Sequence, residues 1–465
     1  MALAITQHPL YTLNPVGQEV IFTVCDLTTV GAKFNVKYVA EVHISTVDID
    51  LNTSTAIGTF KTTPNNTGAG MYDFRPILES FVSPDNLAAL GSEFKGDPTT
   101  AIKPHPLHLV DKYSLNDNVV RYLKIRFTIE GSATATGTVA QVGAEDDSVQ
   151  YTLINGYLKY TDVINRDTDG NFGFNTEIFQ LGGGATGNQL LTNAPTTQYA
   201  NINDYGTLSF MATPKTGDVV DTTVDYIKLV YVSDGGSTTT ENVDNTDANG
   251  GNTTWDLATK NQLLHFGCFP ANLKNWSTTF AAAISTLSYY TVQAFNSSNA
   301  SISDTYTINI NCPTLKGYEP IRLTWLNQWG VWDYYTFTMK STKTISTKGS
   351  TYEQLAGNWN ESKYLPSGYR GGKKAFRVNA TEKIKMNTDF VNESESEWFE
   401  ELINSPEVYI LEGFRVDQSF SMLNQYVVPV RLSTSSHTKK TVANDKLIQY
   451  TFEVEKSKTL RTQSV

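Results

Sequence analysis

The stretch Phe34-Asn-Val-Lys-Tyr-Val-Ala-Glu-Val-His-Ile44 places an apolar side chain at every second position. A period of two is typical of a β-strand that has one face on a hydrophobic core. The stretch Leu123-Lys-Ile-Arg-Phe-Thr-Ile-Glu130 repeats this pattern and puts Lys and Arg on the opposite face. The two stretches therefore predict half-buried strands of a β-sheet.

Similar patterns continue through the rest of the chain. Both faces of the stretch from Val224 to Tyr231 carry apolar side chains, which predicts a strand in the interior of a sheet. Gly330 is expected to supply the turn between two Trp- and Tyr-rich strands. The further strands that the pattern predicts are Tyr306–Ile310, Ile321–Leu326, Asp333–Met339, Tyr426–Leu432 and Leu447–Glu455.

Helical signals are few and short. In Tyr72–Val82, Pro76 suits a first helical turn, and Ile77, Leu78 and Phe81 would then share a face. The clearest helix is predicted at about 394–404, where Ser394 and Glu397 have the spacing of a capping box. Its predicted buried face consists of Trp398, Phe399, Leu402 and Ile403.

The composition favours β-structure with many turns. Of the 465 residues only 18% are charged, and Thr, Ser, Asn and Gly supply much of the polarity. The net charge of −11 argues against a dominant phosphate-binding role, because affinity for nucleic acids needs a basic surface. The N-terminal residues lack the basic and apolar regions of a secretory signal, and no apolar run reaches the roughly 18 residues of a membrane span. Three dispersed cysteines, Cys25, Cys268 and Cys312, predict neither a disulfide framework nor a zinc site.

These signals predict a mainly β protein with several β-sandwich-like or barrel-like domains and a few short helices. We expect three parts. Residues 1–159 form an N-terminal β domain, and residues 160–312 form a middle β domain with a long polar loop insertion at 235–254. Residues 313–465 form a C-terminal β-rich domain that contains the amphipathic helix.

Motifs that carry catalytic chemistry are weak. The glycines in Gly182-Gly-Gly-Ala-Thr-Gly187 match a dinucleotide-binding spacing, but Pro195 interrupts the helix that would have to follow, so a loop is favoured. His105 and His108 lie in a Pro-rich, extended segment, where a surface or packing role is favoured over a metal pair. We therefore expect no enzyme activity and no cofactor, and we nominate no catalytic residue.

One loop has the spacing of a calcium site. Asn165, Asp167 and Asp169 alternate before Gly170, but the twelfth position is Thr176 instead of Glu. The stretch Asn245-Thr-Asp-Ala-Asn-Gly250 repeats the spacing. A hairpin turn explains both loops more simply, and a bound cation is kept as the alternative.

A cluster of aromatic residues invites a binding role. Trp325, Trp329, Trp332 and Tyr334 lie within ten residues of one another. Such rings could form a sugar-binding platform, but a place in the core or in a subunit interface is favoured. We therefore name these four residues as interface candidates.

Several stretches resemble a family of structural proteins from the virions of tailed bacteriophages, common among phages of marine and Bacteroidetes-type hosts. The resembling stretches are Tyr318–Phe337, Glu395–Tyr409 and Asn444–Val454 in the third part, and Leu13–Val16 and Tyr72–Ile77 in the first. The middle part is less similar. The resemblance implies a non-catalytic protein of the tail or baseplate type.

The resemblance implies a ring-forming, distal-tail or hub-like protein that acts by subunit assembly. Its expected partners are further copies of itself and other tail, neck or baseplate proteins, and its expected place is the virion, after folding in the bacterial cytoplasm. A receptor- or glycan-binding module at the tail tip or capsid surface is the alternative. A third hypothesis, a polysaccharide depolymerase, would need a cleft with two carboxylates.

Overall fold

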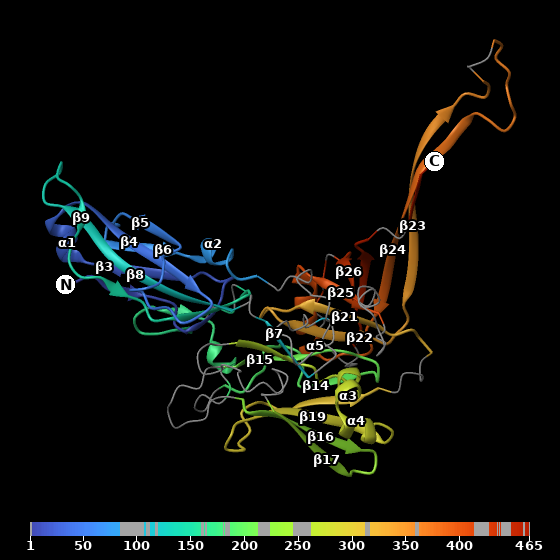
Figure 1. Cartoon of the computed structure of the whole chain (residues 1–465), viewed down its shortest axis with the longest axis horizontal. Helices are drawn as coiled ribbons and strands as arrows, with labels where there is room; N and C mark the ends of the chain where they lie inside the picture. The colour runs from blue at the N-terminus through green and yellow to red at the C-terminus, as the bar shows by residue number, and fades with distance from the viewer. Residues whose placement is uncertain are drawn as a thin grey trace. The chain divides into compact units, whose positions relative to one another are not determined.

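The structure of the protein is a computed structural model. It describes residues 2–83, 107, 112–116, 120–159, 162, 165–179, 181, 187–212, 224–244, 262–311, 317–358, 362–412, 427–434, 436, 438, 448–458 and 461–464. The predicted fold class is confirmed: several separate β-sheets carry the structure, and the helices are few and short (Figure 1).

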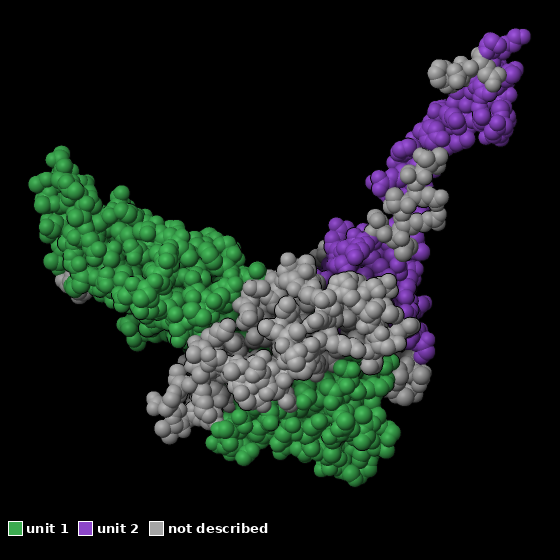
Figure 2. All heavy atoms as spheres, in the orientation of Figure 1, with its two compact units in different colours: residues 1–311, 326–333 green, residues 312–325, 334–465 purple. Residues whose placement is uncertain are grey.

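The chain forms two compact units (Figure 2). Unit 1 comprises Met1–Asn311 and Leu326–Asp333, and unit 2 comprises Cys312–Trp325 and Tyr334–Val465. The short segment Leu326–Asp333 therefore belongs to unit 1, although the residues on either side of it belong to unit 2. The division into three domains stays a prediction.

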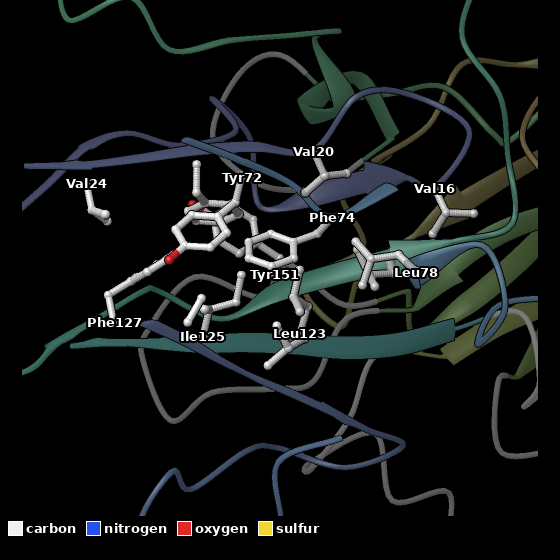
Figure 3. Close-up of a cluster of buried hydrophobic side chains, with 14 of the residues drawn as sticks. Val16, Val20, Val24, Tyr72, Phe74, Leu78, Leu123, Ile125, Phe127 and Tyr151 are labelled. Atoms are coloured by element: carbon white, nitrogen blue, oxygen red, sulfur yellow. The ribbon is translucent and has the colours of Figure 1, made fainter. Parts of the chain in front are cut away.

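Two sheets near the N-terminus enclose the first core of unit 1. One sheet has the order β2-β11-β8-β4-β5, and the other has the order β1-β3-β6. Aromatic rings from both sheets meet between them. Tyr72 of the smaller sheet packs against Phe127 of the larger one (Figure 3), and Phe22 of the smaller sheet contacts the same ring. The strands are β1 (Ala4–Gln7), β2 (Leu13–Pro15), β3 (Ile21–Cys25), β4 (Phe34–Ser45), β5 (Gly58–Thr62), β6 (Ala69–Asp73), β8 (Val120–Ser132) and β11 (Tyr151–Ile154), with β9 (Ala140–Gln141) and β10 (Asp146–Asp147) beside β8.

The predicted alternation holds along most of these strands. Leu123, Ile125, Phe127 and Ile129 are all fully buried on one face of β8. The expectation for Phe34 is wrong, because its side chain is 52% exposed. The reason is a bulge between Phe34 and Lys37, where Asn35 has a φ of 51° and shifts the register of β4.

Two short helices accompany this core. Helix α1 (Leu27–Ala32) is capped by Asp26, whose side chain accepts from the backbone N–H of Thr29. Helix α2 (Arg75–Leu78) has Pro76 in its first turn, as predicted. Leu78 is buried, but Phe81 lies beyond the end of α2 and is exposed, so the predicted apolar face is shorter than expected.

The remainder of unit 1 holds a second pair of sheets. A five-stranded sheet has the order β14-β20-β19-β16-β17, which confirms β16 as an interior strand, and a three-stranded sheet has the order β15-β18-β7. The strands are β7 (Tyr113–Asn116), β14 (Thr197–Ala200), β15 (Leu208–Ala212), β16 (Tyr226–Ser233), β17 (Thr238–Asp244), β18 (Gln262–Phe266), β19 (Leu287–Phe295) and β20 (Tyr306–Ile310). Helices α3 (Pro270–Trp276) and α4 (Thr278–Ala283) follow β18.

The predicted loop insertion at 235–254 needs correction. Its first part is strand β17, which pairs along its whole length with β16. The sequence Thr-Thr-Thr-Glu-Asn-Val-Asp is polar, but Thr favours extended backbone and an edge strand needs no second apolar face. Residues 245–254 lie outside the described part of the chain.

An eight-stranded sheet and one helix make up unit 2. The order is β22-β21-β25-β26-β27-β24-β23, and β28 pairs with β24. The strands are β21 (Ile321–Leu326), β22 (Trp332–Phe337), β23 (Thr342–Gln354), β24 (Gly372–Asn387), β25 (Val408–Leu411), β26 (Val427–Leu432), β27 (Thr451–Lys456) and β28 (Arg461–Ser464). Helix α5 (Glu393–Asn404) packs on this sheet through Trp398 and Phe399, whose rings contact Trp325 and Phe452.

The N-cap of α5 lies two residues earlier than predicted. Asn392 is the N-cap, and its side chain accepts from the backbone N–H of Glu395, while the Glu395 carboxylate accepts from the backbone N–H of Asn392. Ser394 and Glu397 are therefore not the capping box. Ser394 lies inside the first turn, where its hydroxyl donates to the side chain of Asn392. The predicted apolar face is confirmed for Trp398, Phe399 and Leu402, which are buried.

Candidate functional site

The candidate site is the two-stranded ribbon formed by β23 and β24, together with the described residues between them, 355–358 and 362–371. Its ladder runs from Thr342 opposite Lys385 to Gln354 opposite Gly372, with one bulge between Ser350 and Thr351. Every residue of β23 is exposed. The ribbon extends away from the rest of unit 2 (Figures 1 and 2).

The root of the ribbon belongs to the main sheet, and its outer part does not. Residues Lys383–Asn387 of β24 pair with β27 on one side, and Lys383–Lys385 also pair with the start of β23 on the other. Farther out, β24 keeps β23 and gains only the short strand β28, at Arg377–Ala380. Among the described residues, β23 has no strand on its outer side, so it is an edge strand of 13 residues. Such an edge presents unpaired backbone groups that can bind another chain.

The two faces of the ribbon differ in chemistry. Side chains of directly opposed residues in an antiparallel ladder lie on the same face. One face, the basic face, carries Lys348, Arg377, Lys383 and Lys385 among Thr, Ser and Asn residues. The opposite face, the apolar face, carries Ile345, Val378, Ala380 and Ile384, together with Lys343, Thr347, Gly349 and Glu382.

The apolar face continues the core of unit 2 outward. Along β24, Met386 is 0% exposed, Ile384 is 2% exposed and Ala380 is 6% exposed, whereas Val378 is 36% exposed. On β23, Ile345 is 61% exposed. The apolar residues therefore continue past the point where the rest of unit 2 covers them. An exposed apolar row of this kind indicates a contact surface.

The outer end of the ribbon is also rich in exposed aromatic and aliphatic side chains. These residues are Tyr352, Leu355, Tyr364, Leu365, Tyr369 and Phe376. The rings of Tyr352 and Phe376 meet edge to face at the bulge, with centroids 6.5 Å apart. Backbone contacts also join the two sides of this end. Gly357 and Pro366 form an isolated antiparallel β-bridge, and the backbone N–H of Ser367 donates to the carbonyl oxygen of Ala356.

The charge of the ribbon is opposite to that of the rest of the chain. Residues 342–387 contain nine Lys or Arg and three Asp or Glu, which gives a formal charge of +6. The remaining residues, which we call the body, contain 27 Lys or Arg and 44 Asp or Glu, which gives −17. The ribbon is thus a basic arm on an acidic protein.

The residues named as interface candidates from the sequence lie elsewhere. Trp325, Trp329, Trp332 and Tyr334 are all buried inside the chain, so they cannot present their rings to a partner or to a sugar. The Trp329 ring packs 4.5 Å from that of Phe179, and its Nε1–H donates to the side chain of Asn193. The interface assignment is therefore corrected to a core role, because each ring finds apolar or polar neighbours within the chain.

The suspected calcium loop is a hairpin turn between β12 (Asn165–Arg166) and β13 (Phe172–Gly173), which precede the 3-10 helix η4 (Thr176–Phe179). The Asp167 carboxylate accepts from the backbone N–H groups of Asp169 and Asn171 and from the Asn171 side-chain amide. Its oxygens are thus engaged by donors of the same loop. Within the described ranges, no group of three or more His, Cys, Asp and Glu side chains is placed to hold a metal ion.

Several other candidates from the sequence lie outside the described residues. They are His105, His108, Gly182–Thr186, Asn245–Gly250 and Cys312. Cys25 and Cys268 form no disulfide bond with a residue that the structure describes. No sequence motif predicted the ribbon, although the sequence contains one signal for it, the excess of Lys and Arg over residues 342–387.

Comparisons with known proteins give little. No family model and no curated protein matches the chain. Among solved structures, the native conformation of the E. coli alpha-2-macroglobulin is similar over 82% of this chain, with 11% identity and a TM-score of 0.18. This chain corresponds to 21% of the length of that protein. In the part of the chain that the structure describes, none of the helices has the length and apolarity to cross a membrane.

Proposed function

We propose that this protein is a structural subunit of a tailed-bacteriophage virion, placed in a ring of the tail or baseplate, and that it acts by assembly and not by catalysis. The stretches Tyr318–Phe337 and Glu395–Tyr409 support this proposal through their resemblance to virion proteins. They form strands β21 and β22, helix α5 and the start of β25, and these three strands belong to the same eight-stranded sheet as the ribbon's root.

The exposed ribbon is the observation that carries the proposal. An isolated two-stranded ribbon is marginally stable in water, because it has no second layer to bury its side chains. Here the outer part of the ribbon exposes both faces, and Ile345 and Tyr369 are 61% and 78% exposed. Exposed apolar residues on a projecting edge are explained by a neighbouring subunit that covers them.

Analysis of purified particles tests the proposal. Mass spectrometry of phage purified from the host is expected to find the chain in many copies per particle, and electron microscopy is expected to place it in a ring with closed symmetry. A chain that is made during infection but is absent from purified particles would contradict the proposal.

A second candidate function, receptor or glycan binding, is favoured by the tyrosines at the outer end of the ribbon. Tyr364 and Tyr369 are exposed, and aromatic rings can stack on sugars. Binding of the purified protein to host cells, compared with a Tyr364→Ala/Tyr369→Ala variant, tests this function. Equal binding of the two proteins would argue against it.

A further inference from the structure

The charges of the ribbon are balanced at its root and unbalanced farther out. At the root, Lys343 pairs with Glu319 at 2.9 Å, and Lys383 pairs with Glu453 at 3.2 Å. Farther out, Lys348 and Lys373 are exposed and make no ion pair with any residue that the structure describes, and Arg377 donates only to the amide oxygen of Asn379. The outer positive charges therefore lack carboxylate partners among the described residues of their own chain.

The body offers the opposite charge. It carries 44 carboxylate side chains and a formal charge of −17. Complementary charges on two surfaces accelerate their encounter and exclude partners of like charge. A ribbon of charge +6 is therefore attracted to the body of another copy.

We propose that the β23–β24 ribbon of one copy docks onto the acidic body of a second copy of this chain. The two faces point in opposite directions, so the ribbon inserts into the body's surface instead of lying flat on it. The basic face then meets carboxylates of the body, and the exposed part of the apolar face, Ile345 and Val378, becomes covered on the other side. This inference rests on the proposed function and names the partner in the assembly.

Nucleic acid is the other polyanion that a basic ribbon could meet. Two features of the chain disfavour it. The body's charge of −17 repels a phosphate backbone, and the exposed row at Ile345 and Val378 needs an apolar cover that phosphates do not give. A protein surface with carboxylates and apolar groups meets both requirements.

The contact has a consequence for symmetry. The ribbon and the body are different surfaces, so the contact is heterologous, with each copy donating a ribbon and receiving another. Heterologous contacts close into rings when the rotation between copies divides a full turn, and otherwise they form open filaments. The docking of ribbons thus supplies the kind of contact that a ring needs.

The experiment compares two triple charge reversals in the full-length protein. The ribbon variant is Lys348→Glu/Lys373→Glu/Arg377→Glu, and the control variant is Lys37→Glu/Lys274→Glu/Lys458→Glu. All six side chains are exposed, and both variants change the net charge by the same amount. Circular dichroism and thermal unfolding confirm that each variant is folded, and sedimentation velocity measures its self-association.

The wild-type protein is expected to self-associate at an ionic strength of about 0.1 M and to do so less at about 1 M, where the Debye length falls from about 10 to about 3 Å. The ribbon variant is expected to raise the dissociation constant about tenfold or more, and the control variant by less than about threefold. Wild-type association that the ribbon variant leaves unchanged would overturn this inference alone. A wild-type protein that stays monomeric would overturn it together with the proposed self-assembly.

Cross-linking gives a second measurement that needs no variant. A carbodiimide joins lysines directly to carboxylates, and a mixture of ¹⁵N-labelled and unlabelled protein identifies links between copies. We expect such links to join Lys348 or Lys373 to Asp or Glu outside residues 342–387. Oligomers without those links would overturn the inference, as would tight binding of double-stranded DNA that the ribbon variant loses.

Discussion

The backbone of Gly330 lies so close to Asn155 that a Cβ on Gly330 would stand 1.6 Å from the carbonyl oxygen of Asn155. Gly330 also has a φ of 76°, which side chains other than glycine's rarely adopt. The side chain of Asn327 holds the same turn, because its Oδ1 accepts from the backbone N–H groups of Trp329 and Val331. The turn between β21 and β22 therefore requires glycine for two independent reasons.

Substitution of this glycine should lower the stability of unit 1. We expect Gly330→Ala to lower the free energy of unfolding by more than about 3 kcal/mol, because the backbone at Asn155 must move to admit the methyl group. Gly236→Ala is the matched control. Gly236 has a φ of 78° with open space around it, so only the backbone strain of about 1–2 kcal/mol remains. Urea unfolding followed by Trp fluorescence measures the free energy of unfolding of both variants. Equal decreases for the two variants would show that the backbone of Asn155 does not lie close to Gly330.

The cap of α5 gives a second prediction, which separates the observed N-cap from the one that the sequence suggests. Asn392→Ala removes the acceptor for the backbone N–H of Glu395 and should cost about 1 kcal/mol. Ser394→Ala removes a hydroxyl inside an exposed first turn and should cost less than about 0.5 kcal/mol. Thermal unfolding of the two variants checks the order, and a larger loss for Ser394→Ala would restore Ser394 as the cap.

Acid should destabilise the protein through His265 of β18. Burial lowers the pKa of this imidazole to about 3, and its Nδ1 lies 2.7 Å from the hydroxyl of Ser209. The unfolded chain binds the proton with a pKa of about 6.5, so the stability that the neutral ring provides is complete above that pH and is lost as the pH falls from about 6.5 toward 3. Each pH unit in this window costs up to about 1.4 kcal/mol.

A His265→Gln variant isolates this effect. Between about pH 6.5 and pH 5 the wild type should lose up to about 2 kcal/mol more than the variant, because glutamine binds no proton in either state. Urea unfolding at several pH values measures the difference. His8→Gln controls for the removal of an imidazole elsewhere. Parallel pH profiles for the wild type and His265→Gln would mean that the ring is not held neutral in the fold.

The sequence predicted local structure well where one physical signal dominates. The period of two placed Leu123 and Phe127 on the buried face of a strand, and the glycine at 330 marked a turn. Local signals of this kind do not predict which strands pair with one another. For example, β2 pairs in parallel with β11, which lies more than a hundred residues away in the sequence. The bulge that exposes Phe34 also depends on the partner strand.

The candidate site escaped prediction for a related reason. A run such as Thr342–Gln354 looks like any polar strand. The three-dimensional structure was needed to show that all its residues are exposed and that no described strand pairs with its outer edge. The sequence left the aromatic cluster open between the core and a subunit interface, and the four residues were named as interface candidates. The burial of Trp329 depends on residues such as Phe179 that are distant in the sequence, so the sequence could not decide between the two.

The last prediction compares two isoleucines on the same face of the ribbon. Ile384 is 2% exposed, and Ile384→Ala should lower the free energy of unfolding by about 2–4 kcal/mol through the cavity that it leaves. Ile345 is 61% exposed, and Ile345→Ala should change that free energy by less than about 0.5 kcal/mol. Chemical unfolding of the isolated protein at low concentration measures both changes.

Substitution of the exposed Ile345 should weaken self-association. If Ile345 becomes covered when a second copy binds, Ile345→Ala removes apolar area from the contact and should raise the dissociation constant several-fold, at about 25 cal/mol per Å² of lost burial. Sedimentation velocity measures this change under conditions in which the variant is as stable as the wild type. A variant that associates like the wild type would show that the apolar face lies outside the contact. A variant as unstable as Ile384→Ala would show that the monomer itself already buries Ile345.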